Sequence, residues 1–231
     1  MSGGQAVAPW QWRGHPLQLL AARALWDPQQ GLLLLADLHL GKAESFQAQG
    51  IPLPSDGDAS TLAALAAVVE QVHPREVIVL GDLVHSRLGV TPALRQQLAQ
   101  WPQRFDCRLS LIGGNHDRGL VLEGLALQPA QARGPLWLSH EPDSAPGLLN
   151  VCGHGHPVAC VGDGADQLRL PCFAYDPALE QLMLPSFGHL TGGHPCAEGC
   201  HLWLVAEDAI VPWPPSPLRP PRPGRRQRQR P

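Results

Sequence analysis

Short apolar runs recur along the chain, and polar residues follow each of them directly. The first is a run of four leucines and an alanine at 32–36, which ends in Asp37-Leu38-His39. A run this short does not separate strand from helix by periodicity, so the flanking residues decide. Asp37 and His39 are two positions apart, and on a strand both side chains would point to the same face. We therefore predict a buried strand whose carboxyl end presents a carboxylate and an imidazole.

Four later runs end in the same way. They are 76–80 before Gly81-Asp82, 108–112 before Gly113-Gly114-Asn115-His116-Asp117, 136–138 before Ser139-His140, and 148–152 before Gly153-His154-Gly155-His156. Each ending alone is weak evidence for a site. Together they place six of the eleven histidines at or near strand ends, which chance does not produce.

The first half of the chain alternates strands with helices. Apolar residues at helical spacing predict a helix from about 56 to Val72, and Thr91 before Pro92 predicts the start of a second helix that includes Leu94, Leu98 and Trp101. This order favours parallel neighbouring strands with right-handed crossovers. The carboxyl ends of the three strands would then lie at one edge of a sheet.

The remaining segments give less regular patterns. We predict a pair of short strands within 17–26 and a mobile segment at 1–14. A polar stretch follows Lys42. Beyond Asp117 short strands dominate, which favours a mixed or antiparallel second sheet packed against the first. These later strands are predicted at 136–139, 149–152, 167–174, 181–185 and 201–206.

Length and composition favour one domain over 1–218 and a disordered Pro/Arg-rich tail over 219–231. The chain has 231 residues, of which 44% are hydrophobic, and no run approaches the roughly 20 apolar residues of a membrane span. With no secretory signal at the N-terminus, we expect a soluble cytoplasmic protein. Its six cysteines are then expected to be free thiols.

Charge is distributed unevenly. The net charge is -3, but the tail holds six arginines and no acid, so the rest carries 11 basic and 20 acidic side chains, or -9. The tail suits a nucleic-acid arm, in which each arginine neutralises a phosphate. An ordinary solvated tail has the same composition, and both interpretations stay open.

The strand ends supply a set of oxygen and nitrogen donors that is typical of metal sites. The candidate metal ligands are Asp37, His39, Asp82, Asn115, His140, His154 and His156. Such mixed donors suit Mn, Fe, Zn or Ni better than Ca or Mg. Seven side chains are too many for one ion and suit two divalent ions that share a carboxylate. A pair of cations can grip a phosphoryl oxygen and activate water.

The five motifs resemble those of the calcineurin-like metallophosphoesterases, in the same order and with compatible spacing over residues 37–156. A closer resemblance is to the bacterial ligase-associated DNA-damage-response phosphoesterases, which are described as endonucleases. It rests on Asp37-Leu38-His39-Leu40-Gly41-Lys42, on Gly50-Ile51-Pro52 with Pro54, and on Gly81-Asp82-Leu83-Val84-His85-Ser86.

The resemblance implies a four-layer α/β/β/α sandwich and a role for each site residue. It implies that Asp37, His39 and His156 hold one metal, that Asn115, His140 and His154 hold the other, and that Asp82 bridges them. It also implies that His116 stabilises developing charge or protonates the leaving oxygen. Asp117 would orient His116 through the other ring nitrogen.

Further polar residues are candidates for substrate or metal binding. His85, Lys42 and Arg118 flank the predicted cleft and could contact phosphate, although packing or solvated roles are equally compatible with the pattern. A second cluster, His189, His194, Cys196, Cys200 and His201, could bind zinc but lacks the paired spacing of a zinc knuckle. A Gly/Pro-rich loop with incidental thiols explains it more simply.

Three functions are compatible with these features. The leading hypothesis is a manganese-dependent phosphodiesterase or endonuclease acting on DNA or nucleotide-like diesters, in DNA repair with a ligase and a helicase. The same centre would serve a phosphomonoesterase or cyclic-nucleotide phosphodiesterase. A non-catalytic repair scaffold is a third alternative, although such scaffolds usually lose a ligand. The sequence does not indicate an oligomeric state.

Overall fold

The computed structural model describes residues 6–53, 57–162, 167–189 and 191–213, and these form two β-sheets with helices. The predicted tail at 219–231 lies outside the described residues, and the single domain over 1–218 stays a prediction. All six cysteines are free thiols. No helix in the described ranges is long and apolar enough to cross a lipid bilayer.

The first sheet contains seven strands in chain order. They are β1 (Val7–Trp12), β2 (His15–Leu20), β3 (Ala24–Asp27), β4 (Leu32–Leu35), β5 (Glu76–Leu80), β6 (Arg108–Ile112) and β7 (Leu127–Gln128). The pairs from β1 to β4 are antiparallel, whereas β4 to β7 are parallel. The predicted parallel neighbours are therefore confirmed, and the carboxyl ends of β4, β5 and β6 lie at one edge.

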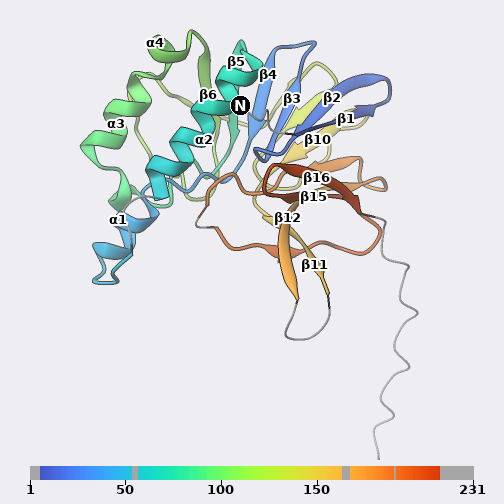
Figure 1. The fold of residues 1–231 in the computed structure, drawn as a ribbon. Helices are drawn as coiled ribbons and strands as arrows, with labels where there is room; N and C mark the ends of the chain where they lie inside the picture. Colours follow the sequence, from blue (N-terminus) through green and yellow to red (C-terminus); the bar gives the residue numbers. More distant parts are fainter. Residues whose placement is uncertain (1–5, 54–56, 163–166, 190, 214–231) are drawn as a thin grey trace, which may run out of the picture.

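Helices cover one face of this sheet (Figure 1). They are α1 (Lys42–Gln47), α2 (Gly57–Val72), α3 (Pro92–Ala99) and α4 (Trp101–Phe105), with a short 3₁₀ turn, η1 (Arg87–Gly89). The side chain of Thr91 accepts a hydrogen bond from the Leu94 backbone N–H at 3.1 Å, so the predicted N-cap is confirmed. No α-helix follows Phe105 in the described ranges, and the helical layer lies on the first sheet alone.

The second sheet is mixed. Its strands are β8 (Gln131–Arg133), β9 (Leu136–Leu138), β10 (Leu149–Cys152), β11 (Pro157–Val161), β12 (Leu168–Asp176), β13 (Gln181–Met183), β14 (His194–Pro195), β15 (His201–Ala206) and β16 (Ala209–Trp213). Strand β10 runs parallel to β9 and β13, whereas β12 is antiparallel to β11, β13 and β15. The parallel pairing brings the carboxyl ends of β9 and β10 together.

Alternate residues of β4 and β5 face two different cores. Leu33, Leu35, Val77 and Val79 pack with the helices, in a cluster that includes Leu65, Leu94 and Trp101. Leu32, Leu34, Ile78 and Leu80 pack instead with residues of the second sheet, among them Leu138, Val151 and Phe173. Strands buried on both faces read as continuous apolar runs, and this is why 32–36 and 76–80 contain so few polar residues.

Several local expectations were wrong. Residues Val7–Trp12, within the segment expected to be mobile, form edge strand β1, where Pro9 is tolerated because an edge strand can lack a ladder N–H. Helix α1 begins at Lys42 and lies mostly in the polar stretch, where the sequence pattern predicted no element. The second predicted helix ends at Ala99, because Pro102 cannot continue it, and α4 begins at Trp101.

The intersheet core gives a stability prediction. Leu34 is 0% exposed between the two sheets, so Leu34→Ala should lower the free energy of unfolding by about 2–5 kcal/mol. The measurement is urea unfolding followed by circular dichroism. Leu168→Ala, at a side chain that is 62% exposed, is the control and should change stability by less than about 0.5 kcal/mol. Equal effects of the two substitutions would contradict the packing described here.

Candidate metal centre

The loops that follow five strands meet at one place and bring together all seven predicted donor residues. Asp37 and His39 follow β4, Asp82 follows β5, Asn115 follows β6, His140 follows β9, and His154 and His156 follow β10. Ligands commonly lie beyond the carboxyl ends of parallel strands. Here both sheets contribute such an edge to the same site.

One group of donors consists of Asp37, His39 and His156, whose ligand atoms all lie within 4.8 Å of one another. His156 Nε2 is 3.2 Å from Asp37 Oδ1 and 3.4 Å from His39 Nε2. Asp37 and His39 are buried. Three donors of mixed type therefore face one small volume.

A second group consists of Asp82, His140 and His154. His140 Nε2 lies 3.1 Å from His154 Nδ1 and 2.9 Å from Asn115 Oδ1. His140 Nδ1 donates to the Leu80 carbonyl at 2.9 Å. This bond fixes the tautomer, so that the lone pair of Nε2 faces the other donors.

Asp82 lies between the two groups. Its Oδ1 accepts the backbone N–H of His116 at 3.0 Å. Its Oδ2 is 3.5 Å from His140 Nε2 and 3.9 Å from His39 Nε2. One oxygen is thus held by the backbone, and the other faces both groups, as a shared ligand must.

These distances fit two divalent ions. Metal–nitrogen bonds of about 2.1 Å place two ligands of one tetrahedral or octahedral ion about 3.0–3.4 Å apart. The contacts of His156 in the first group are 3.2 and 3.4 Å, and His140 Nε2 lies 2.9–3.5 Å from the donor atoms of Asn115, His154 and Asp82. Burial, followed by the charges of His156, His116, His85 and Lys42, lowers the pKa of His39 to about 3. His39 is therefore neutral near pH 7, the form that binds metals.

The backbone at the donors is unusual. Asp37, His39, Asp82, His154 and His156 all have φ between +43° and +65°, in the left-handed region that costs L-residues roughly 1–2 kcal/mol. The expectation that Asp37 and His39 share a strand face is therefore wrong, because β4 ends at Leu35. Tight left-handed turns, rather than strand alternation, aim these side chains inward.

Two glycines make room for the donors. A Cβ at Gly81 would lie under 3.0 Å from the His140 ring, and a Cβ at Gly114 would lie under 3.0 Å from Asp82 Oδ1. Gly81 also has φ of +79°, which favours glycine. The glycines in the two motifs are thus explained by close approach of a metal-site side chain to the backbone.

Asp117 has a different contact from the one expected. His116 Nδ1 donates to the backbone carbonyl of His85 at 2.7 Å, so Asp117 does not orient this ring. The Asp117 carboxylate, which is 0% exposed, accepts the backbone N–H groups of Asp82 at 2.7 Å and Gly114 at 3.0 Å. Asp117 therefore joins the two loops through hydrogen bonds to their backbones. The expectation of a direct contact with His116 was wrong.

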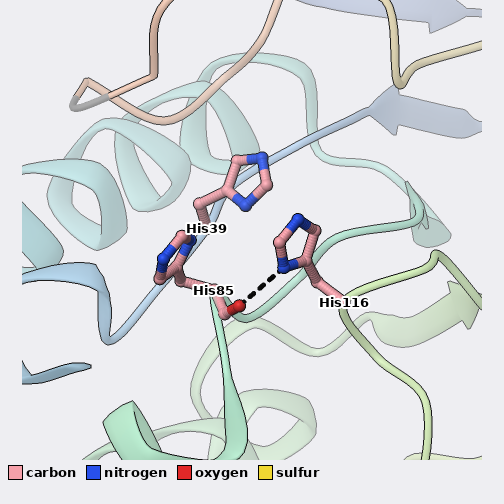
Figure 2. Close-up of side chains that lie close together, drawn as sticks. All are labelled: His39, His85 and His116. Atoms are coloured by element: carbon pink, nitrogen blue, oxygen red, sulfur yellow. Dashed lines mark hydrogen bonds between the residues drawn. The ribbon is translucent and has the colours of Figure 1, made fainter. Parts of the chain in front are cut away.

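Three imidazoles lie together beside the first donor group. Figure 2 shows His39, His85 and His116, whose nitrogen ligand atoms lie within 4.8 Å of one another. The His85 ring stacks on His116 with centroids 5.3 Å apart and on Phe46 with centroids 5.6 Å apart. His116 Nε2 is 4.0 Å from Asp82 Oδ2. Phe46 was missed by the sequence reasoning, because one aromatic residue in a polar segment gives no signal.

A family model described as "Calcineurin-like phosphoesterase" matches residues 32–191. This range includes all seven donors and His116. The chain belongs to the calcineurin-like phosphoesterase family. The protein is therefore a metal-dependent phosphoesterase, and the divalent metals that the family uses have candidate Asp and His ligands in both donor groups.

Two solved structures extend the comparison. The nuclease MPE of Pseudomonas putida is 32% identical, with a TM-score of 0.74, over 90% of this chain and all of that chain. Yfce, a phosphoesterase from E. coli, is 16% identical, with a TM-score of 0.40, over 78% of this chain and 96% of that chain. A search of curated proteins found no match.

A cavity of about 490 Å³ adjoins the second donor group. Asn115 and His140 form part of its wall, and Arg118 lines it as predicted for a residue flanking the cleft. Glu141 and Asp143, from the loop after β9, also line it. Sequence reasoning missed both acids, although they follow His140 within three positions.

Lys42, the third predicted substrate-binding residue, lies away from this cavity at the start of α1. It is close enough to the first donor group for its charge to lower the pKa of both His39 and His85.

The five residues of the second predicted cluster do not form one group of metal ligands, although His194, Cys196 and Cys200 line the same cavity. The groups of three or more possible metal ligands in the described residues include none of His189, His194, Cys196, Cys200 and His201. Cys196 instead has its Sγ 3.5 Å from Cys172 Sγ on β12. The structure therefore gives no support to a zinc site built from that cluster.

The close approach at Gly114 gives a prediction for the centre. Gly114→Ala should displace Asp82, because its Cβ would meet Asp82 Oδ1 and the Asp82 backbone nitrogen. We expect loss of about one metal equivalent and at least a tenfold weaker apparent metal affinity, in the range seen when groups supporting a ligand are changed. The measurement is metal content after dialysis against manganese. Gly192→Ala, where a Cβ meets nothing within 4 Å, should bind metal normally.

Proposed function

We propose that the protein is a two-metal phosphodiesterase that hydrolyses phosphodiester bonds in DNA or nucleotide-like substrates. The single observation that carries the proposal is the position of Asp82 Oδ2 between two donor groups, with His116 Nε2 at 4.0 Å. Two metal ions and an adjacent proton donor are what in-line displacement at phosphorus needs. The 32% identity with a nuclease over 90% of the chain supports the same reaction.

The ligand assignment follows the two groups. Asp37, His39 and His156 would hold one ion, Asn115, His140 and His154 the other, and Asp82 both. Manganese is the proposed metal, because mixed carboxylate, amide and imidazole donors suit it, although Fe, Zn and Ni accept similar donors. When bound, two such ions supply an activated water and neutralise charge on the phosphoryl oxygens.

His116 is the proposed proton donor. Its Nδ1 hydrogen is committed to the His85 carbonyl, so Nε2 is the nitrogen that faces the site. A second proton on Nε2 can be given to the leaving oxygen, which otherwise departs as an unstable alkoxide. The stacking of His116 on His85 holds the ring in this orientation.

Three cationic or polar side chains would bind the substrate backbone. His85 and Lys42 lie on the side of the first donor group, and Arg118 lines the cavity beside the second. A diester that crosses the centre would thus meet a phosphate-binding side chain on either side. The described part of the protein is otherwise acidic, so these residues and the arginine-rich segment at 219–231 would supply the attraction to DNA.

The biological setting proposed here is DNA repair in the cytoplasm, in association with a ligase and a helicase. It is supported by the resemblance of the Asp37–Lys42 and Gly81–Ser86 motifs to the ligase-associated group.

The decisive assay compares substrates and metal content on one preparation. Manganese-loaded protein should hydrolyse bis(p-nitrophenyl) phosphate and single-stranded DNA much faster than p-nitrophenyl phosphate. Preference for the monoester would favour a phosphomonoesterase. Absence of all turnover, with both ions bound, would favour a scaffold and refute the proposal.

Two substitutions separate metal binding from proton transfer. Asp82→Ala should lose metal and activity together. His116→Ala should keep both metals but lower kcat by about 10²–10⁴-fold, the usual contribution of general acid–base catalysis. Metal analysis and steady-state kinetics measure the two effects. His201→Ala, at an exposed histidine of β15, is the control and should retain activity.

A further inference from the structure

The cavity beside the second donor group is placed to receive one side of a cleaved diester. It shares Asn115 and His140 with the centre and has a volume of about 490 Å³. Small-molecule sites typically have volumes of about 300–1,000 Å³. A phosphate bound at the centre would therefore have space on this side for a complete nucleoside.

The lining of the cavity carries charges of both signs, with one basic residue, Arg118, that can hold a phosphate and two acids that cannot. Glu141 and Asp143 are acidic residues of this lining, and Ile112, Leu127 and Pro142 are apolar residues of it. Carboxylates repel phosphate but accept hydrogen bonds from N–H groups. A flat, uncharged group with N–H donors, such as a nucleobase, matches this combination.

Asp143 is held in position by its neighbours. Its Oδ2 accepts from Trp137 Nε1 at 2.9 Å, and its Oδ1 accepts from the Ser144 backbone N–H at 2.7 Å. Its own N–H donates to Asn150 Oδ1 at 3.0 Å. The bonds from Trp137 and Ser144 also hold the pKa of Asp143 below its usual value, so the group is charged at neutral pH.

Other residues of the loop after β9 belong to the same hydrogen-bond network. Asn150 Nδ2 donates to Ser139 Oγ at 2.7 Å, and Ser139 Oγ donates to the Glu141 carbonyl at 2.7 Å. Asn150 is buried on β10. The loop that carries both acids is therefore anchored to the sheet, which reduces the entropy lost on binding a ligand.

We infer that this cavity is a nucleobase subsite in which Asp143 favours guanine beside the scissile phosphate. The inference rests on the proposed phosphodiesterase function. A carboxylate has about four lone-pair positions, and two of those on Asp143 are occupied, so each oxygen can accept one more hydrogen bond. Guanine presents two adjacent donors, N1–H and the N2 amino group. Thymine presents one N–H between two carbonyl oxygens, which the carboxylate repels.

The first test measures binding without turnover. Manganese-loaded wild-type protein is titrated calorimetrically with 5′-dGMP and with 5′-dTMP, which share the phosphate and differ in the base. We expect dGMP to bind about tenfold more tightly, within the range of one bidentate base contact. Asp143→Asn should reduce the ratio to below about twofold. Asp208→Asn, at an exposed aspartate in the turn between β15 and β16, should leave it unchanged.

The second test maps cleavage of a single-stranded thymine tract that contains one guanine. Wild-type cuts should concentrate on one side of the guanine, and Asp143→Asn should cut evenly. Equal affinities for the two nucleotides, or discrimination that survives Asp143→Asn, would overturn the inference. Discrimination through Asp143 without any DNA cleavage would retain the subsite and refute the proposed function. DNA cleavage without discrimination between guanine and thymine would support the proposed function and overturn the guanine subsite.

Discussion

The candidate centre depends on one buried carboxylate, that of Asp117. It accepts backbone N–H groups of Asp82 at 2.7 Å, Gly114 at 3.0 Å and Val84 at 3.4 Å, and so joins the loop after β5 to the loop after β6. Burial raises the pKa of Asp117, whereas these hydrogen bonds oppose the shift. Because buried N–H groups without partners are costly, the loops keep this arrangement, and it positions Asp82 and Asn115.

A similar constraint acts at the other donor group. Asp37 accepts the His154 backbone N–H through its carboxylate at 3.0 Å, and its carbonyl accepts the Gly188 N–H at 3.1 Å and the Ser186 hydroxyl at 2.8 Å. The left-handed backbone at five donors is thus held by bonds between loops of both sheets. Strain of this kind persists where surrounding structure enforces it, and it is concentrated at functional sites.

Much of the site could be predicted because its residue types are distinctive. Five apolar runs that end in Asp, Asn or His indicated both the strands and the donors, and the strand topology placed their ends together. The elements that were missed lack such patterns. Strands β1 and β16 contain Pro9 and Pro212 at a sheet edge, and α1 has six residues, too few for helical periodicity. Asp117 was given the wrong contact, because adjacency to His116 in sequence says nothing about the direction of either side chain.

The sequence by itself determined the candidate donors, the parallel order of β4, β5 and β6, and the two-sided burial of β4 and β5. These features follow from local residue type and alternation, which act over a few positions. Only the tertiary structure decided which nitrogens of His116 and His140 face the site, which oxygen of Asp82 faces both donor groups, and that Glu141 and Asp143 line a cavity beside Asn115. Those outcomes depend on contacts between residues far apart in the chain, such as His140 with Leu80 and Asp143 with Asn150, and the packing of the two sheets brings such residues together.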